Sequence, residues 1–559
     1  MLLSVAFAAV QLLFSNTKDG CEYLRTNTFP NYSGPIPKVT SYRDMLEVTA
    51  NDPLSAMFLA KKRCTSLSLD NILNVQNEHK SGKFKMNKAE DFETDVGDSA
   101  GLDIKSIIYS GNPDNRIDVV FMGDGYTQNQ RDQFFNDISR LVNEMWNGET
   151  FKPLLPMFNI WALFVPSQDS GITFMSYRKN TAFGLTRDGN ELRGILPNKA
   201  GVARQLCRQL GTKCDYPSII GNDVFYGGLG GEFVISTSSL TTGTTVLRHE
   251  MGHNFGTEGE EYDDGFVYSG YNNARSINSI PWSRWANTAI KTEEKLNLLA
   301  TEHPWSSLDK PYVLNFKTSS DYKYWKVLIS LSGVEDTSRV EVSVDDRILT
   351  LESKGTLDRQ FYYWKFTDPL PNGQHTLTVK QLKKPTLRDP RTGDFMQRTV
   401  CSLDIHEYQK NVHEDFYKVG AFPTWDIRGS KSYRPTNDLC IMRNMTSTKF
   451  CPICTEGFHL NFLQKIKLID GLNVTCSGNT GTATLQAIPY GQFSKSSPSD
   501  VYFDISWSKD GKVQEALAGK TSASNLASGS YDVSLKFNTP HVRLESKYLT
   551  DKRTFKVTC

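Results

Sequence analysis

The chain has 559 residues, of which 38% are hydrophobic and 22% charged, and it is long enough for roughly three or four folded domains. Its 63 Lys and Arg residues almost balance its 62 Asp and Glu residues, so the net charge of +1 excludes a global field that attracts nucleic acid or an anionic membrane. We therefore expect neither partner, and any other partner has to be inferred from local sites.

The N-terminus begins with an apolar run, MLLSVAFAAVQLLFS, that is too short to cross a bilayer comfortably. It has the length of a signal-peptide core, although no Lys or Arg precedes it, and the alternative is a buried N-terminal strand or helix. We predict a signal peptide over residues 1–16 and therefore a secreted, extracellular protein. An even number of cysteines, 10, agrees with disulfide bonds in that compartment, and three glycosylation sequons lie at Asn31, Asn444 and Asn473.

Residues 17–110 are mixed and polar, without strong periodicity. Within them, residues 77–101 are charged and poor in apolar side chains, which is typical of a linker. We interpret residues 17–110 as a propeptide or an accessory domain.

Strand and helix patterns alternate in the next part of the chain. RIDVVFMGDGYT predicts a strand that ends in an Asp-Gly turn, and the segment after it has apolar positions at helical spacing. We predict a strand over 116–127, a second strand that leaves into a loop over 158–172, helices over 128–147 and 202–211, and two strands around a glycine-rich loop over 222–237. This alternation indicates an α/β layer, which we assign to the first part of a catalytic domain, residues 111–308.

Two later regions show short alternating strands separated by turn residues, a pattern typical of all-β modules. They cover residues 309–400 and 471–559, and Cys476 and Cys559 are placed to bridge the ends of the second. Residues 401–470 then form the second part of the catalytic domain. The predicted fold class is an α/β catalytic domain with an inserted all-β module and a C-terminal, β-sandwich-like domain.

The motif HEMGH carries the main functional prediction. His249 and His253 lie four residues apart, so on a helix they share one face and their imidazoles can bind one zinc ion. Glu250 would then face a water activated by the metal and remove its proton as the water attacks a peptide carbonyl. The alternative is a polar helix whose side chains face solvent. We favour the zinc site, because the preceding TTGTTVL is able to enter a buried helix.

A third metal ligand is expected just after this helix. Gly256 stands where metzincins have the glycine that bends the chain back toward the metal. The position of the usual third histidine is Gly259, so a carboxylate must replace it, either Glu260, which we prefer, or Glu261. Met442, in CIMRNM, is a candidate for the methionine turn of such a site, although a single methionine more often belongs to a core.

Four segments resemble the IgA-peptidase family of secreted zinc metallopeptidases. They are, in chain order, VVFMGDGYT, FNIWALFVPSQDSGI, LRHEMGHNFGTEGEEYDDG and YRPTNDLCIMR. The resemblance covers residues 115–290 and 415–470. It implies a metzincin-like endopeptidase in which His249 and His253 bind zinc and Glu250 is the general base.

The resemblance also bears on the remaining positions of the site. Family members have an aspartate in place of Glu260, followed by a Glu-Tyr pair that Glu261 and Tyr262 match, so the resemblance implies that Glu260 is the third ligand. Met442 falls on the family's methionine turn. Residues 309–400 would be an insertion that shapes the cleft or binds substrate. The family name implies no preference for immunoglobulins.

The segment Cys451-Pro-Ile-Cys454 has Cys440 before it and His459 after it. This set is open to interpretation as a second zinc site, as a redox pair or as structural disulfides. In a secreted chain we favour structural disulfides.

Other clusters receive structural interpretations. GGLGGE (227–232) lacks the glycine spacing of a dinucleotide site, so we expect a flexible loop near the cleft whose backbone contacts an extended substrate. The acidic residues around Asp263 lack the spacing of a calcium loop, so we expect a solvated acidic turn. His406 and His413 are assigned to a surface helix.

The sequence as a whole predicts an enzyme, a secreted zinc-dependent endopeptidase that needs Zn2+ and acts on protein or peptide substrates. The competing hypothesis is a non-catalytic secreted binding protein, in which β modules recognise a ligand and the zinc site is a relic or structural. The presence of Glu250 disfavours this second hypothesis, because a purely structural site needs no general base.

Overall fold

The structure is a computed structural model, and it describes residues 101–187, 192–286, 290, 296–318, 321–409, 418–490 and 501–559, together with the backbone of strands before residue 51. Most of the predicted linker, Asn31 and His413 lie outside the described residues. The N-terminal strands are antiparallel in the order β2-β1-β4-β3, with bounds Ala9–Thr17, Gly20–Phe29, Lys38–Ser41 and Met45–Ala50 for β1 to β4. Strand β1 overlaps the stretch assigned to a signal peptide, which stays a prediction.

A mixed five-stranded sheet forms the centre of the molecule, in the order β12-β11-β6-β7-β5. Only the edge strand β5 is antiparallel to its neighbour. Every residue of β6 and β7 is buried, as expected for strands covered on both faces. The bounds are Asp103–Ile108 for β5, Ile117–Asp124 for β6, Phe158–Phe164 for β7, Tyr216–Gly221 for β11 and Val234–Thr237 for β12.

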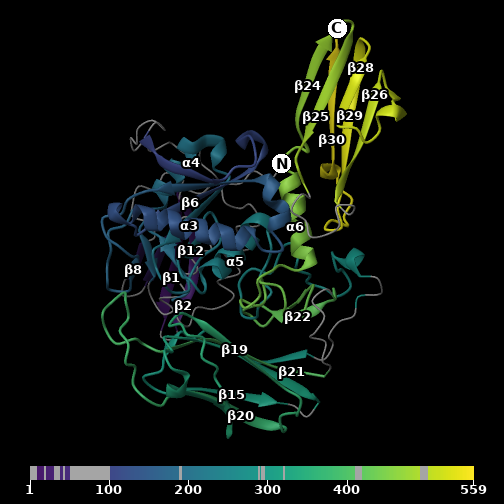
Figure 1. Ribbon diagram of the computed structural model, residues 1–559. Coiled ribbons are helices and arrows are strands. Elements are labelled where there is room, and N and C mark those ends of the chain that lie inside the picture. Colours follow the sequence, from purple (N-terminus) through teal and green to yellow (C-terminus); the bar gives the residue numbers. More distant parts are fainter. Residues whose placement is uncertain are drawn as a thin grey trace.

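Helices cover both faces of this sheet (Figure 1). Helices α3 (Arg131–Trp146) and α5 (Gly243–Gly256) share a core with one face of β6, whereas α4 (Ala200–Leu210) packs with the alternate residues of β6 on the other face. The structure thus confirms the two predicted helices, α3 and α4. The strand predicted directly after residue 222 is wrong, because the strand there, β11, has already ended at Gly221.

The inserted module consists of two antiparallel sheets whose inner faces share one hydrophobic core. One sheet has the order β13-β21-β16-β19 with β14 beside β21, and the other has the order β15-β20-β17-β18. The module is wider than predicted, since its strands run from residue 296 to residue 408. Its bounds are Leu296–Glu302 (β13), Ser306–Ser307 (β14), Tyr312–Thr318 (β15), Tyr324–Ser332 (β16), Val340–Val344 (β17), Arg347–Leu349 (β18), Gln360–Phe366 (β19), Gly373–Gln381 (β20) and Thr399–Tyr408 (β21).

The chain then returns to the central sheet through a hairpin and a fourth helix. Strands β22 (Phe422–Trp425) and β23 (Lys431–Arg434) pair with each other, and α6 (Pro452–Leu463) packs against α5. Three short strands, β8 (Thr173–Phe174), β9 (Leu185–Arg187) and β10 (Leu196–Pro197), form a small sheet of their own.

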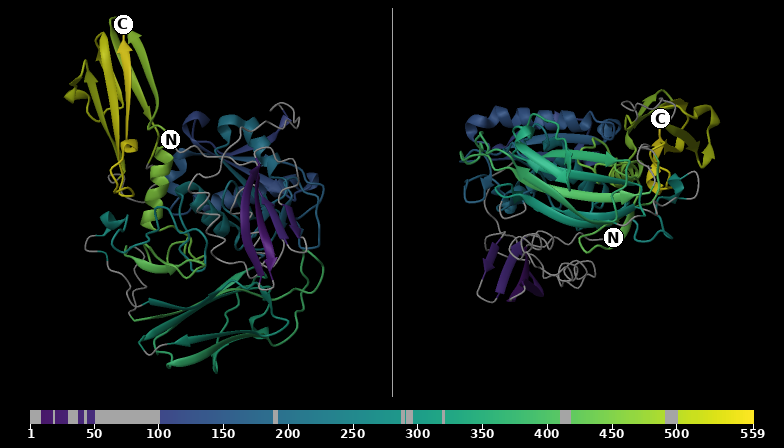
Figure 2. Two further views of the ribbon diagram at one scale, coloured as in Figure 1. Left: turned by 180° about the vertical axis from the view of Figure 1, so that it is seen from behind. Right: turned by 90° about the horizontal axis from the view of Figure 1, so that it is seen from below.

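The C-terminal domain is a pair of facing antiparallel sheets that stands away from the rest of the molecule (Figures 1 and 2). Cys476 and Cys559 form the predicted disulfide across a sequence separation of 83 residues. The strands are β24 (Ile469–Ser477), β25 (Thr480–Ala487), β26 (Tyr502–Lys509), β27 (Lys512–Val513), β28 (Ser522–Leu526), β29 (Gly529–Asn538) and β30 (Thr550–Val557).

Taken together, the described residues form a β-rich molecule with several small sheets and few helices. None of the helices in this described part has both the length and the apolar character needed to cross a membrane.

Candidate metal centre

Helix α5 brings the two histidines of HEMGH onto one face, with ring centroids 5.0 Å apart. The helix ends at Gly256, and Thr257 follows in the left-handed conformation with φ 55°, which turns the chain back over the helix. This return places Glu260 against both imidazoles. Its carboxylate oxygens lie 3.2 Å from His249 Nε2 and 3.3 Å from His253 Nε2.

The opposite ring nitrogen of each histidine is held by a backbone carbonyl. His249 Nδ1 lies 3.1 Å from the carbonyl oxygen of Ile441, and His253 Nδ1 lies 2.7 Å from that of Glu258. A carbonyl can only accept a hydrogen bond, so both Nδ1 atoms carry the proton and the Nε2 lone pairs face Glu260. Such second contacts are typical of histidines that bind metals.

Three donor atoms whose lone pairs converge on one point can share one cation between them. For tetrahedral zinc with bonds of about 2.0–2.1 Å, neighbouring ligand atoms lie about 3.3 Å apart, which matches the observed spacing. Glu260 Oε2 is buried and has no hydrogen-bond partner among the described residues. Burial disfavours a charged imidazole, but without a metal the Glu260 carboxylate raises the pKa of His253 to about 9, so the site attracts a positive charge that a bound metal would supply in place of this proton. The donor set therefore fits a divalent metal.

Glu250 projects from α5 into the cleft that contains these donors. Burial raises the pKa of its carboxyl group, as expected for an acid in a site of restricted solvent access. The glycine-rich loop passes directly over it, because a Cβ atom built on Gly230 would lie only 2.8 Å from Glu250 Oε2. The loop glycines thus allow the backbone to approach the helix, in agreement with the predicted position of this loop beside the cleft.

Met442 lies against the same helix at its central glycine. A Cβ atom on Gly252 would fall 2.6 Å from Met442 Sδ, so a side chain at position 252, directly before His253, would displace the methionine. The turn that carries Met442 also supplies the Ile441 carbonyl that holds His249. The predicted methionine turn is therefore in contact with the helix that carries the histidines.

Gly259 explains why no histidine stands at the usual third position. A Cβ atom there would lie 2.3 Å from the backbone oxygen of Ser269, and the backbone of Gly259 is fixed on both sides by the Asn272 side chain. The loop after α5 is thus packed too tightly at this point for any side chain. The carboxylate of Glu260, one residue later, faces the histidines instead.

We expect Gly259→Ala to lower the free energy of unfolding by about 1–3 kcal/mol, the usual cost of overpacking, because its contact is with rigid backbone. Thermal unfolding with metal analysis measures the effect. Gly201→Ala is the matched control, since no atom lies within 4 Å of its added Cβ and it stands in helix α4. An equal melting temperature for Gly259→Ala and the parent would contradict the tight packing described above.

Glu261 points away from the histidines. Its side chain is 0% exposed and accepts a hydrogen bond from Asn272 Nδ2 at 2.9 Å. It lies near Cys454, with Oε1 3.7 Å from Sγ. The structure therefore places Glu260, and not Glu261, beside the two histidines.

The acidic turn after α5 is not solvated, so that prediction is wrong. Asp263 is 0% exposed and binds His406 Nε2 at 2.9 Å and Arg443 Nη1 at 2.7 Å. The surface helix predicted for His406 is also wrong, since this residue is buried in strand β21. Both errors have the same cause. Asp263 and His406 are far apart in the sequence but bind each other, and this contact offsets the free-energy cost of burying two polar groups.

The inserted module thereby holds both ends of α5. His406 binds Asp263 just after the helix, as described above. Just before the helix, Asp358 of the module accepts hydrogen bonds from Ser239 Oγ at 2.6 Å and Thr241 Oγ1 at 2.9 Å. The module is thus part of the framework that positions the histidines.

The disulfides predicted near the methionine turn are wrong, because Cys440, Cys451 and Cys454 are unpaired in the described part of the chain. His459, grouped with them in the sequence, bonds to the carbonyl of its own helix at Thr455. Burial lowers the pKa of His459 to about 3.

The cleft has a volume of about 440 Å³ and lies between the central sheet and the inserted module. Its walls include the backbone of the glycine-rich loop on one side and side chains of β16, β19 and β21 on the other. Arg359 of the module stacks over the rings of Tyr226 and Phe361 at 4.4 Å and 4.7 Å. Sequence inspection missed these residues, since nothing in the local pattern of an all-β module marks which strand faces a distant helix.

No curated protein matches the chain. Among solved structures, a ruminal GH26 endo-beta-1,4-mannanase matches with 12% identity and a TM-score of 0.14 over 21% of each chain, so the chain spans about a fifth of that protein. The adhesin domain of Epf from Streptococcus pyogenes matches with 10% identity and a TM-score of 0.10 over 44% of this chain and 70% of that one. A two-domain esterase active on acetylated mannans matches with 9% identity and a TM-score of 0.13 over 53% and 92%.

These TM-scores are too low to support any statement on fold or function. A family model gives a more direct result, because the family described as IgA Peptidase M64 matches residues 106–315. The matched segment contains strands β6, β7, β11 and β12 of the central sheet, helix α5 and the loop with Glu260. Over these residues the chain is therefore similar to the IgA-peptidase family of metallopeptidases, in agreement with the resemblance seen in the sequence.

Proposed function

We propose that the chain is a secreted zinc-dependent endopeptidase with a metzincin-like catalytic domain. The observation that carries this proposal is the convergence of His249, His253 and Glu260 on one point beside Glu250, inside a cleft. The match to a peptidase family supports hydrolysis of peptide bonds as the reaction.

In this proposal His249, His253 and Glu260 hold the zinc ion. When bound, zinc polarises the scissile carbonyl and increases the acidity of water in the site. The carbonyls of Ile441 and Glu258 keep both imidazoles in the tautomer that presents Nε2. The loop that carries Glu260 is held in turn by the bonds of Asp263.

Glu250 acts as the proton carrier. As a carboxylate it accepts a proton from the attacking water, and as a carboxylic acid it returns that proton to the leaving amine. Its partly buried position favours this exchange, because a raised pKa brings the charged and neutral forms closer in free energy.

The cleft suits an extended peptide. The backbone of Gly228, Gly230 and Gly231 lines one wall without side chains, which leaves peptide groups accessible to the main chain of a substrate. Phe361 and Leu328 of the inserted module provide apolar contacts on the facing wall. We therefore assign substrate selection to the inserted module.

Secretion is supported by the apolar N-terminus and by two disulfides, Cys207–Cys214 and Cys476–Cys559. The alternative of a non-catalytic binding protein is less well supported, because Glu250 lies beside the metal donors and a site that only binds a ligand requires no general base there.

Metal removal tests the proposed function. We expect the purified protein to cleave casein, to lose this activity in 1,10-phenanthroline and to regain it with added Zn2+. Proteolysis assays combined with elemental analysis measure both quantities, and a serine-protease inhibitor serves as the control for contaminants. Cleavage that continues after complete removal of zinc would contradict a metal-dependent mechanism.

A further inference from the structure

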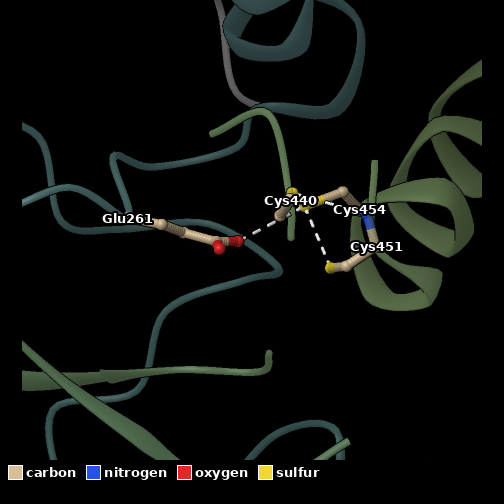
Figure 3. Close-up of side chains that lie close together, drawn as sticks. All are labelled: Glu261, Cys440, Cys451 and Cys454. Atoms are coloured by element: carbon tan, nitrogen blue, oxygen red, sulfur yellow. Dashed lines mark hydrogen bonds between the residues drawn. The ribbon is translucent and has the colours of Figure 1, made fainter. Parts of the chain in front are cut away.

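A second cluster of metal-ligating side chains lies beside the loop that carries Glu260 (Figure 3). It consists of Glu261, Cys440, Cys451 and Cys454, whose ligand atoms all lie within 4.8 Å of one another. All four side chains belong to residues with 0% exposure. The catalytic proposal uses none of them.

Three separate parts of the chain meet in this cluster. Glu261 comes from the loop after α5, and Cys440 comes from the turn that leads to Met442. Cys451 is the residue that precedes α6, and Cys454 lies in its first turn, with Pro452 between them. A Cys-x-x-Cys pair at a helix start is a frequent way of presenting two sulfur atoms to one metal.

The distances between sulfur atoms favour a shared metal over a disulfide. Cys440 Sγ lies 3.7 Å from Cys454 Sγ, and Cys451 Sγ lies 3.5 Å from it. A disulfide requires about 2.05 Å. Tetrahedral zinc with Zn–S bonds of about 2.3 Å separates neighbouring sulfur atoms by about 3.8 Å. The observed spacing is therefore close to that of a zinc–thiolate centre.

Glu261 completes the set as the fourth ligand. Its Oε1 atom lies 3.7 Å from Cys454 Sγ, and its Oε2 atom is buried with no hydrogen-bond partner among the described residues. A buried carboxylate oxygen without a donor is costly, and a metal ion in the cluster removes that cost. Asn272 Nδ2 donates to Oε1 of the same carboxylate, so within the described part of the chain Oε2 stays available to the cluster.

We propose that Cys440, Cys451, Cys454 and Glu261 bind a second, structural zinc ion. Thiolate ligands select zinc over magnesium or calcium, and four protein ligands leave no open position for a substrate, as in structural zinc sites. Binding releases the thiol protons to solvent, because sulfur coordinates zinc as the thiolate.

Such an ion would connect the parts that build the catalytic centre. Glu261 is bonded in sequence to Glu260, and Cys440 lies two residues before Met442. The Glu261 amide also donates to the Met442 carbonyl at 3.1 Å. The second zinc ion therefore fixes the loop of the third catalytic ligand to the methionine turn and to α6.

Metal stoichiometry with X-ray absorption on the full chain tests this proposal. We expect two zinc ions per chain in the parent and one in His253→Ala, whose remaining ion has sulfur neighbours at about 2.3 Å. Cys454→Ser should also keep one ion, with only nitrogen and oxygen neighbours. Cys401→Ser is the matched control, a buried unpaired cysteine outside the cluster, and should keep both ions.

The results separate this proposal from the proposed function. If the parent binds one ion with sulfur neighbours and His253→Ala has the same zinc content and spectrum, the second site is supported and the catalytic metal site is wrong. If the only zinc signal has no sulfur neighbours, or if non-reducing peptide mapping joins Cys440 to Cys451 or Cys454, the second site is wrong. The parent and His253→Ala spectra decide the question even if Cys454→Ser does not fold.

Discussion

Replacement of Glu250 by glutamine is expected to reduce casein cleavage by about 100- to 10,000-fold, the range over which general acid–base catalysis contributes to rates. Glutamine has the same shape but accepts no proton, so the attacking water keeps its proton and the leaving amine receives none. The three metal donors do not include Glu250, so the zinc content should not change. The measurement is the initial cleavage rate, alongside zinc per chain and the melting temperature.

Glu232→Gln is the matched control for this variant. Glu232 is an exposed carboxylate at the end of the glycine-rich loop, where it pairs with Arg204 and stays outside the cleft lining. We expect it to cleave at the parental rate. A Glu250→Gln variant that cleaves as fast as the parent would show that another group carries the proton.

Replacement of His253 by alanine is expected to remove both the catalytic metal and the activity, with a loss of cleavage of at least about 100-fold. The variant retains His249 and Glu260, but two ligands hold zinc poorly, and the side chain that faces both Glu260 and the Glu258 carbonyl is gone. Elemental analysis and the casein assay, made on the same preparation, measure the two losses together.

His541→Ala provides the corresponding control, because His541 belongs to the C-terminal region and stacks on His459, far in sequence from α5. This variant should keep its metal content and its activity. If His253→Ala kept the zinc content of the parent, including the ion whose neighbours are only nitrogen and oxygen, His253 would be removed from the ligand set.

Sequence patterns were sufficient for the parts of the fold that depend on local periodicity. Helix α3 was predicted because its apolar residues recur at helical spacing and pack one face of the helix against the core. Strand β6 was predicted because it is a continuous apolar run that is buried on both faces. Strand β11 was missed, since Pro217 in its second position is disfavoured inside a sheet.

Some features of the site also follow from local sequence, whereas others depend on residues far apart in the chain. The spacing of His249 and His253 within one helical turn is sufficient to predict a shared metal. The choice between Glu260 and Glu261 depends on how the loop turns, which is set by contacts with residues far along the chain. The environment of His406 depends on Asp263, 143 residues away, so no local pattern could predict it.

The attachment of the inserted module at both ends of α5 has a consequence for the order in which activity arises. The Ile441 carbonyl that orients His249 lies 192 residues further along the chain, beyond the inserted module, and closing so long a loop carries an entropic penalty that folding of the intervening module helps to offset. A nascent or partly unfolded chain would form helix α5 without a complete metal centre. The metal centre is therefore expected to become complete only after the segments on both sides of the inserted module have folded together.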